Sequence, residues 1–320
     1  MINLRPFDAA SESDYDALAQ LKSATLPDYA ETVAAIKDDD AQYAGTGKPW
    51  GRLFARDDSG AVVGMSEFAP ALWQPGAGKF YLELLVHPEW QGRGVGKQLY
   101  DALTETMRPH EPTWLKTECR EDYARAARFF TDRGFRETMR HYESRLDLAA
   151  FDPVPFTAAW NVPGVQFVSY RALLATDPDA PTKNWQAAME MLPDVPGDEP
   201  FVPQTFAAFQ SLVMDRPALD LDGYFVTVDE NTGEYVGLSH IWRRSVGSDL
   251  DTGLTAVKRA YRRRGIALSL KLRVVAWARE NGFRELRTSN EVANRAMLGI
   301  NERLGFVKLP PWIELVWRMG

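Results

Sequence analysis

The stretch Val86–Gly96, "VHPEWQGRGVG", returns in related form as Val257–Ala267, "VKRAYRRRGIA". In both copies an apolar run typical of a strand leads through a short turn into a glycine-containing loop, and an amphipathic helical pattern begins after the loop. Glycine lets the backbone come close to a ligand. The N-terminus of the following helix directs unpaired N–H groups and the positive end of its dipole at the loop. The sequence therefore predicts two anion-binding loops.

These loops belong to a longer internal repeat, which decides the domain organisation. One constant offset separates Gln91 from Arg262, Thr117 from Thr288, and Phe135 of "TDRGF" from Phe306 of "NERLGF". Upstream, the spacing of Val63 and Val236 exceeds that offset slightly, so an earlier loop differs in length between the two copies. We expect two fused domains of one fold, over residues 1–149 and 164–320, with a proline-containing linker at 150–163.

Each half is expected to be an α/β domain with a mixed sheet, because helical patterns alternate with strands and hairpins. The second half is expected to open with a strand at residues 165–170. A short helix around residues 185–191 and a second helix over residues 206–213 should follow.

Composition narrows the class of protein. The chain has 320 residues, with 45% hydrophobic and 25% charged residues, as in ordinary globular proteins. Its net charge of −7 argues against a general binder of nucleic acid or of anionic membranes. A single cysteine, Cys119, allows no internal disulfide, and no run reaches membrane-spanning length. We expect a cytoplasmic protein without a metal site, since no cluster has metal-ligand spacing.

The two loops resemble the acetyl-CoA-binding motif of the GCN5-related N-acetyltransferases, (Gln/Arg)-x-x-Gly-x-(Gly/Ala), in which the loop binds the cofactor pyrophosphate. The resemblance covers most of the chain in two copies, as in a tandem member of the family. It implies acetyl-CoA (coenzyme A) as cofactor, held by the loop residues Gln91, Gly92, Arg93, Gly94, Val95, Gly96, Arg262, Arg263, Arg264, Gly265, Ile266 and Ala267. The family also uses an N–H of the preceding strand to polarise the thioester carbonyl. Here that strand position corresponds to Leu85–Val86 and Ala256–Val257.

The catalytic positions of the family are only partly kept. Many members carry a tyrosine four residues before the helix-ending Gly-Phe, where it protonates the departing thiolate; this chain has Phe130 and Asn301 there. Asn301 is the candidate at that place in the second half. An asparagine that binds the pantetheine arm is matched by Asn294, whereas the first half has Tyr123. The second domain is therefore expected to be the catalytic half.

Four residues are candidates for the base that takes the ammonium proton. Asp251 lies eleven residues before Arg262, where histone-acetylating members carry a glutamate; it is either that base or a strand-edge or turn residue. Glu83 and Glu67 are strand carboxylates, either in a cleft or on an exposed face. His240 is either a proton relay or a structural histidine.

The resemblance implies an enzyme that transfers acetyl to a primary amine, which we expect to belong to a small molecule, by direct attack on the thioester. The alternative is a non-enzymatic acyl-CoA sensor or scaffold, suggested by the missing tyrosines. A third interpretation, an unrelated phosphate-binding α/β protein, conflicts with the constant repeat offset. Expected partners are limited to the amine substrate, with no nucleic acid and no membrane, in a monomer or homodimer.

Overall fold

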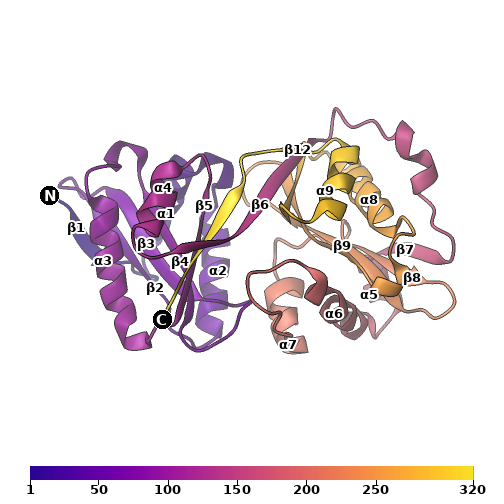
Figure 1. Cartoon of the computed structure of the whole chain (residues 1–320), viewed down its shortest axis with the longest axis horizontal. Coiled ribbons are helices and arrows are strands. Elements are labelled where there is room, and N and C mark those ends of the chain that lie inside the picture. Colours follow the sequence, from indigo (N-terminus) through magenta and orange to yellow (C-terminus); the bar gives the residue numbers. More distant parts are fainter. Residues whose placement is uncertain (320) are drawn as a thin grey trace. The chain divides into compact units, whose positions relative to one another are not determined.

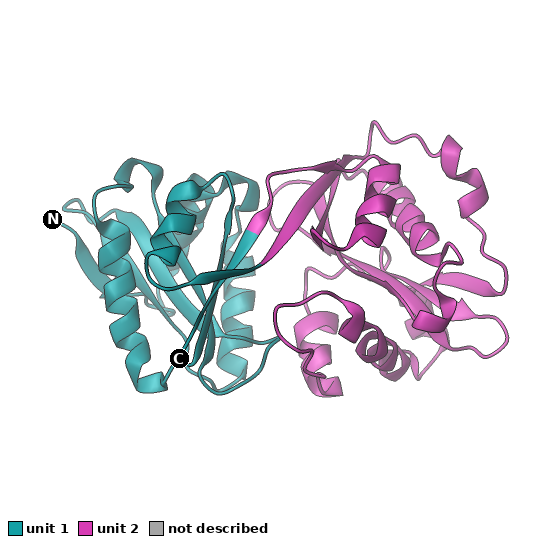
Figure 2. Cartoon of the chain, viewed as in Figure 1, with its two compact units in different colours: residues 1–138, 313–320 teal, residues 139–312 magenta. Residues whose placement is uncertain are grey.

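The computed structural model describes residues 1–319, and these form two compact units (Figure 2). Unit 1 consists of Met1–Thr138 together with the chain from Ile313 onward, and unit 2 consists of Met139–Trp312. Each unit has its own hydrophobic core. None of the helices in the described chain is long and apolar enough to span a membrane.

The strands of unit 1 have the order β1-β2-β3-β4-β5-β13, of which β1 to β5 are labelled in Figure 1. Its strands are β1 (Asn3–Pro6), β2 (Gly51–Arg56), β3 (Val62–Pro70), β4 (Lys79–Val86), β5 (Trp114–Arg120) and β13 (Trp312–Arg318). The first four pair antiparallel, and β4 pairs parallel with β5. Alternate residues of these strands face opposite sides of the sheet, which fixes the side that each candidate residue occupies.

The helices of unit 1 are α1 (Glu12–Thr25), α2 (Val33–Gly45), α3 (Val95–Met107) and α4 (Ala124–Thr131), with single turns η1 (Pro27–Tyr29), η2 (Pro88–Trp90) and η3 (Arg108–His110). Helices α1 and α2 pack with Met65 and Leu85 on one face of the sheet. Helix α3 packs with Phe80 and Leu82 on the other face. Ser11 caps α1, because its side chain accepts a hydrogen bond from the Asp14 amide.

The sheet of unit 2 has the order β6-β11-β10-β9-β8-β7, and β12 pairs with β6. Its strands are β6 (Arg136–Asp147), β7 (Val165–Ser169), β8 (Phe225–Asp229), β9 (Tyr235–Arg243), β10 (Asp249–Val257), β11 (Glu285–Glu291) and β12 (Val307–Lys308). Strands β10 and β11 are parallel, and the other pairs are antiparallel.

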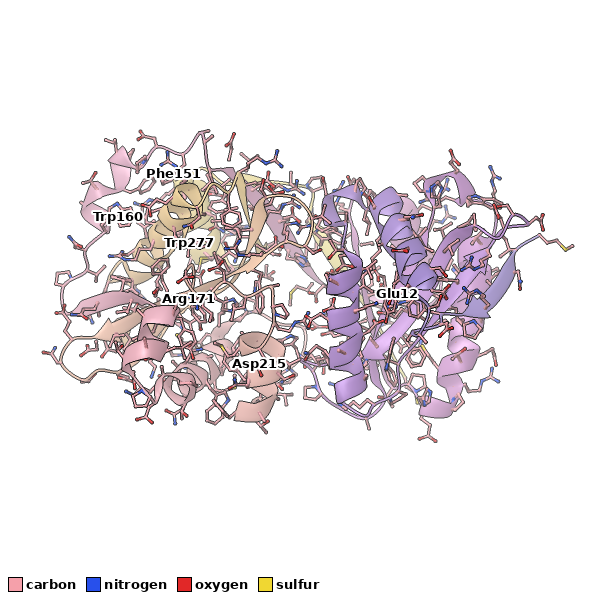
Figure 3. All side chains as sticks on the ribbon, turned by 180° about the vertical axis from the view of Figure 1, so that it is seen from behind. Glu12, Phe151, Trp160, Arg171, Asp215 and Trp277 are labelled. Carbon is pink, nitrogen blue, oxygen red and sulfur yellow. The ribbon has the colours of Figure 1, made fainter. Side chains whose placement is uncertain are left out.

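The helices of unit 2 are α5 (Tyr170–Thr176), α6 (Ala180–Met191), α7 (Phe206–Phe209), α8 (Ile266–Glu280) and α9 (Arg295–Leu304), with short turns η4 (Val154–Ala159), η5 (Leu192–Asp194), η7 (Arg259–Tyr261) and the π-helical η6 (Gln210–Met214). Residues of α5, α6 and α7 form one core with Leu238 of β9, and α8 packs into two other cores. Phe151 and Trp160, labelled in Figure 3, join the α8 side, and Ser269 of α8 donates a hydrogen bond to the Trp160 carbonyl.

The last strand of each repeat lies in the other unit. Strand β6 closes the first repeat, yet residues 141–147 pair with β11 of unit 2. The constant offset of the repeat makes β6 equivalent to Val307–Arg318, the segment that holds β12 and β13. Strand β13 from Ile313 onward completes unit 1, where Ile313 and Leu315 pack in its core.

The mixed α/β sheet expected for both halves is confirmed. The compact units divide the chain at other points than the expected boundaries of 149 and 164, because the two final strands are exchanged. The expected strand at 165–170 stops at Ser169, whose side chain accepts a hydrogen bond from the Ala172 amide and starts α5, a helix that the sequence pattern did not predict.

Candidate functional site

The two glycine loops have the same backbone conformation. Gly94 (φ 82°) and Gly265 (φ 88°) are left-handed N-cap residues of α3 and α8. Gly92 (φ 77°) and Arg263 (φ 60°), two residues earlier, are also left-handed. No side chain caps either helix, so the first-turn N–H groups face the loop without a side-chain acceptor. Both loops therefore have the geometry of an anion site.

Side chains of the two loops also make equivalent contacts. The Gln91 side-chain amide donates to the Val86 carbonyl at 3.1 Å, and Nε of Arg262 donates to the Val257 carbonyl at 3.0 Å. Arg93 lies over the Trp90 ring, as Arg264 lies over the Tyr261 ring. The polar first residue of the motif thus ties its loop back to the end of the preceding strand.

Each loop follows a strand that parts from its parallel neighbour. Strand β4 pairs with β5 only through Lys79–Tyr81, and β10 pairs with β11 only through Asp249–Thr252. We call these partings the first and the second fork. Beyond each fork, the edge of residues 82–86 or 253–257 that faces the parallel neighbour has no strand partner among residues 1–319. Backbone groups there remain available to a ligand.

Of the two forks, both within the described residues 1–319, the second contains a β-bulge and the first does not. In β10, Thr252 stands opposite Ile241 and Thr255 opposite Ser239, so residues 253 and 254 together face His240. In β4 the corresponding register runs without a shift over residues 80–86. One additional residue therefore bends β10 just before its loop.

The surroundings of the two loops differ. Asp194 of η5 accepts from Nε of Arg259 at 2.9 Å and also forms an ion pair with Arg262. These arginines lower the pKa of Asp194 to about 2, first through the Arg259 hydrogen bond. The first loop instead has Arg125 of α4 beside it, whose Nη1 would lie 3.2 Å from a Cβ at Gly92. Neither Asp194 nor Arg125 belongs to the repeated motif, so the motif alone did not reveal them.

A family model described as the acetyltransferase (GNAT) family matches residues 16–135 and 185–306, one match for each repeat. The two matches together cover most of the chain, and each contains one fork with its glycine loop.

The chain belongs to the GNAT family of acetyltransferases.

Solved structures support the tandem arrangement of this GNAT protein. It is similar to a tandem GNAT protein from the clavulanic acid biosynthesis pathway (TM-score 0.77, 20% identity, covering 100% of this chain and 99% of that one). It is also similar to a GCN5-related N-acetyltransferase from Sphaerobacter thermophilus (TM-score 0.74, 18% identity, covering 100% and 96%). At these identities the likeness concerns the fold. A search of curated proteins finds no sequence match.

In unit 1 of the GNAT chain, the candidate bases Glu83 and Glu67 are cross-strand neighbours on the α1 face of the sheet. Lys22 lies 3.2 Å from Glu83, and Arg52 binds Glu67 with Nε at 2.6 Å and Asp40 at 2.9 Å. Burial raises the pKa of Glu67 to about 7 against the effect of Arg52. The Glu67 side chain is 9% exposed and the Glu83 side chain is 35% exposed, so Glu83 is the more accessible carboxylate.

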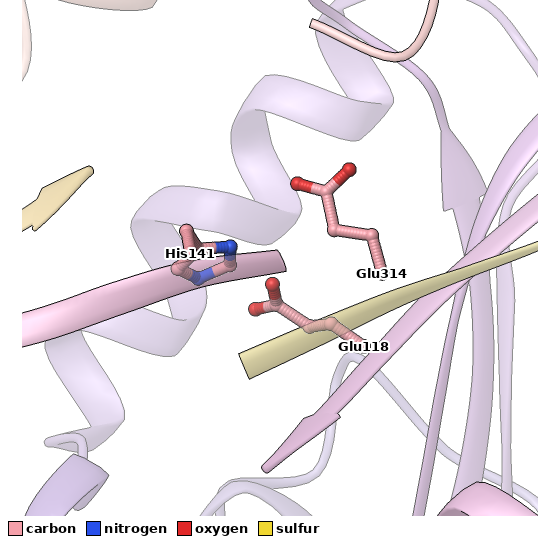
Figure 4. A group of neighbouring side chains, drawn as sticks. All are labelled: Glu118, His141 and Glu314. Atoms are coloured by element: carbon pink, nitrogen blue, oxygen red, sulfur yellow. The ribbon is translucent and has the colours of Figure 1, made fainter. Parts of the chain in front are cut away.

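Two further carboxylates lie in unit 1 beyond its fork. Glu118 of β5 and Glu314 of β13 have carboxylate oxygens within 4.8 Å of each other (Figure 4). Although Glu118 is exposed as a whole residue, desolvation of its carboxyl group and then the Glu314 charge raise its pKa to about 7. Lys116 pairs with Glu314 at 2.5 Å and offsets part of this negative charge.

In unit 2, three of the four candidates from the sequence occupy different surroundings. Asp251 of β10 pairs with Arg244 at 2.9 Å, and desolvation raises its pKa in spite of that cation. Asn294 is the N-cap of α9 and accepts from the Met297 amide. Asn301 is buried, and its side-chain amide donates to Asn290 at 2.6 Å. Asn301 therefore has a structural hydrogen bond and no proton to give at neutral pH.

Two buried basic side chains of unit 2 lack a charged partner. The Leu254 amide donates to Nε2 of His240 at 3.1 Å, and burial lowers the pKa of His240 to about 4. Lys271 of α8 is 2% exposed and lies over the Phe306 ring, and it forms no hydrogen bond or ion pair within residues 1–319. Burial lowers the pKa of Lys271 to about 7.

Proposed function

We propose that this GNAT protein transfers the acetyl group of acetyl-CoA to the primary amine of a small molecule, with unit 2 as the catalytic half. The observation that carries the proposal is the bulge in β10, which lies between the second fork and the second glycine loop. A bulge bends the part of the strand that follows it, so the unpaired backbone N–H groups there point in a fixed direction, as stabilisation of a developing oxyanion requires.

The residues present fit the cofactor. The uncapped first turns of α3 and α8, with left-handed glycines before them, suit its pyrophosphate. When bound, the cofactor supplies an acetyl group activated as a thioester. In unit 2 the loop residues 262–267 would hold the phosphates, Asn294 would face the pantetheine arm, and an N–H of Ala256 or Val257 would polarise the carbonyl.

The chain must also take a proton from the attacking amine, because only the neutral amine is a nucleophile. Asp251 is the proposed base in unit 2. Its raised pKa brings it closer to the range in which a carboxylate both accepts and releases a proton, and Arg244 fixes its orientation. In unit 1 the corresponding role falls to Glu83, which Lys22 holds on the α1 face.

A non-enzymatic acyl-CoA-binding role is the second candidate, and one observation favours it. The family's acid position holds Phe130, a core residue packed against Tyr100 and Phe135, and Asn301, which is engaged with Asn290. Neither can protonate a leaving thiolate, so turnover would depend on water for that step.

The deciding experiment is calorimetric titration of acetyl-CoA into the wild type and into Gly94→Glu and Gly265→Glu. A glutamate in either loop would place negative charge in the phosphate site. Gly60→Glu and Gly233→Glu are matched controls, because these glycines are also left-handed and have open space around them. We expect Gly265→Glu to abolish one site, while the controls bind as the wild type does.

A screen of primary amines for release of the CoA thiol then separates an enzyme from a sensor. Turnover that disappears with Gly265→Glu and survives Gly94→Glu supports unit 2 as the catalytic half. Binding without turnover of any amine leaves the acyl-CoA-binding role, and absence of binding overturns both.

A further inference from the structure

The bulge in β10 is held by a side chain of the neighbouring strand. His240 of β9 is 8% exposed, and its Nε2 accepts the Leu254 amide at 3.1 Å. This N–H belongs to one of the two bulge residues, which no longer match the ladder of β9 one to one. The imidazole therefore replaces the backbone acceptor that a regular antiparallel ladder provides.

The imidazole cannot move far from this position. The ring of His240 meets Tyr224 and Trp242 edge-on, with ring centroids 5.4 and 5.3 Å away. Gly253, the other bulge residue, lies directly against it, since a Cβ at Gly253 would be 2.1 Å from Cε1 of His240. A glycine is thus required on one side of the ring, and aromatic groups enclose the rest.

The corresponding strands of unit 1, β3 and β4, have neither a bulge nor a histidine at this place. There Glu67 and Phe68 of β3 stand opposite Glu83 and Leu82 of β4, two residues against two. In unit 2 the single residue His240 stands opposite two residues of β10. The bulge therefore comes from one additional residue in β10, and His240 is the single residue that stands opposite the bulge.

We propose that His240 is a positioning residue of unit 2: by holding the Leu254 amide it keeps β10 bulged, so that the N–H group of Val257, on the strand edge away from β9, points at a bound thioester carbonyl. This inference rests on the proposed function, because it concerns the acetyl end of the cofactor. The effect of His240 should be limited to acetyl-CoA. Only acetyl-CoA has the thioester carbonyl that can accept this hydrogen bond, and free coenzyme A lacks it. The loss of His240 should therefore reduce the preference for acetyl-CoA and leave the affinity for coenzyme A nearly unchanged.

The test measures the dissociation constants of acetyl-CoA and of coenzyme A by calorimetry, in a Gly94→Glu background that leaves only the second loop. We compare His240→Ala, His240→Gln and the control Tyr235→Phe, which removes a hydrogen bond to Asp177 from the same strand away from the bulge. In His240→Ala, the preference for acetyl-CoA over coenzyme A should fall about threefold to tenfold, which is the effect expected from the loss of one hydrogen bond. Glutamine can accept the Leu254 amide, so His240→Gln should recover most of the preference, and Tyr235→Phe should keep it.

A second variant keeps the test decisive if His240→Ala does not fold. Gly253→Ala pushes a methyl group into the imidazole and should reduce the same preference with His240 present. An unchanged preference in a folded His240→Ala or Gly253→Ala protein overturns the inference, as does an equal loss of affinity for both ligands. These outcomes leave the proposed function standing; it fails instead if the Gly94→Glu protein binds neither ligand or turns over no amine.

Discussion

The buried imidazole of His240 should make unit 2 sensitive to acid. Its pKa is lowered by burial from 6.5 to about 4, so the folded protein holds it neutral at pH values where the unfolded chain protonates it. A group whose pKa is lower in the folded state contributes stability that is complete above its unfolded value. That stability is lost as the pH falls toward the folded value. The sensitive window is therefore pH 6.5 down to about 4.

The magnitude follows from the shift. The pKa difference is about 2.5 units, at about 1.36 kcal/mol per unit. Relative to neutral pH, the free energy of unfolding should therefore fall by about 2 kcal/mol at pH 5 and by roughly 3 kcal/mol at pH 4. Desolvation is the cause of the lowered pKa, and no charged group contributes to it. His240→Gln should remove this contribution while keeping an acceptor for the Leu254 amide.

The assay is native-state hydrogen exchange followed by mass spectrometry of peptides from β9 and β10, between pH 7 and pH 4.5. Peptides from unit 2 are needed because a chain with two units need not unfold in one step. After correction for the pH dependence of exchange itself, the wild type should lose about 2 kcal/mol more protection than His240→Gln by pH 5. Parallel curves for the two proteins would refute the argument that burial holds His240 neutral.

Three further results are expected. Lys271→Met should raise the stability of unit 2 at pH 7 by about 2–5 kcal/mol, because the buried amine no longer has to give up its charge. Chemical denaturation should show this gain shrinking toward pH 10, and equal stabilities at pH 7 would contradict it. Asp194→Asn should tighten acetyl-CoA binding at the second loop, because two arginines are then free to bind phosphate. Calorimetry measures this affinity. Weaker binding would mean that Asp194 instead holds the arginines in place for the cofactor. Asp251→Asn should slow turnover most at low pH, and an unaltered pH–rate profile would clear Asp251 of the role of base.

The sequence predicted the repeat, the mixed sheets and the two glycine loops because each depends on local patterns. The loop conformation needs a left-handed residue at Gly94 and Gly265, and glycine marks it directly. The bulge could not be predicted, because it depends on how many residues of β10 stand opposite β9, and one additional residue leaves no local pattern. Asp194 was likewise hidden, because it meets Arg259 only when segments distant in the sequence fold together.

The catalytic candidates show the same limit. Asp251 was singled out by its spacing from Arg262, but its ion pair with Arg244 comes from the neighbouring strand end. Asn301 was placed by counting from Gly305, and only the structure shows its amide engaged by Asn290. Spacing along the chain locates a position in a family pattern, whereas the partners that decide its chemistry come from other strands.

The exchange of final strands sets an order of events during synthesis. Unit 1 needs β13, whose first residue in that unit, Ile313, leaves the ribosome only after the whole of unit 2 has followed Thr138. At about 5–20 residues per second, the nearly complete sheet waits roughly 10–35 s with the edge of β5 uncovered. Unpaired strand edges are where chains associate with one another. A nascent chain that stalls before Ile313 therefore exposes an aggregation-prone edge that is covered in the finished protein. A chaperone that binds β5 should reduce aggregation most during that interval.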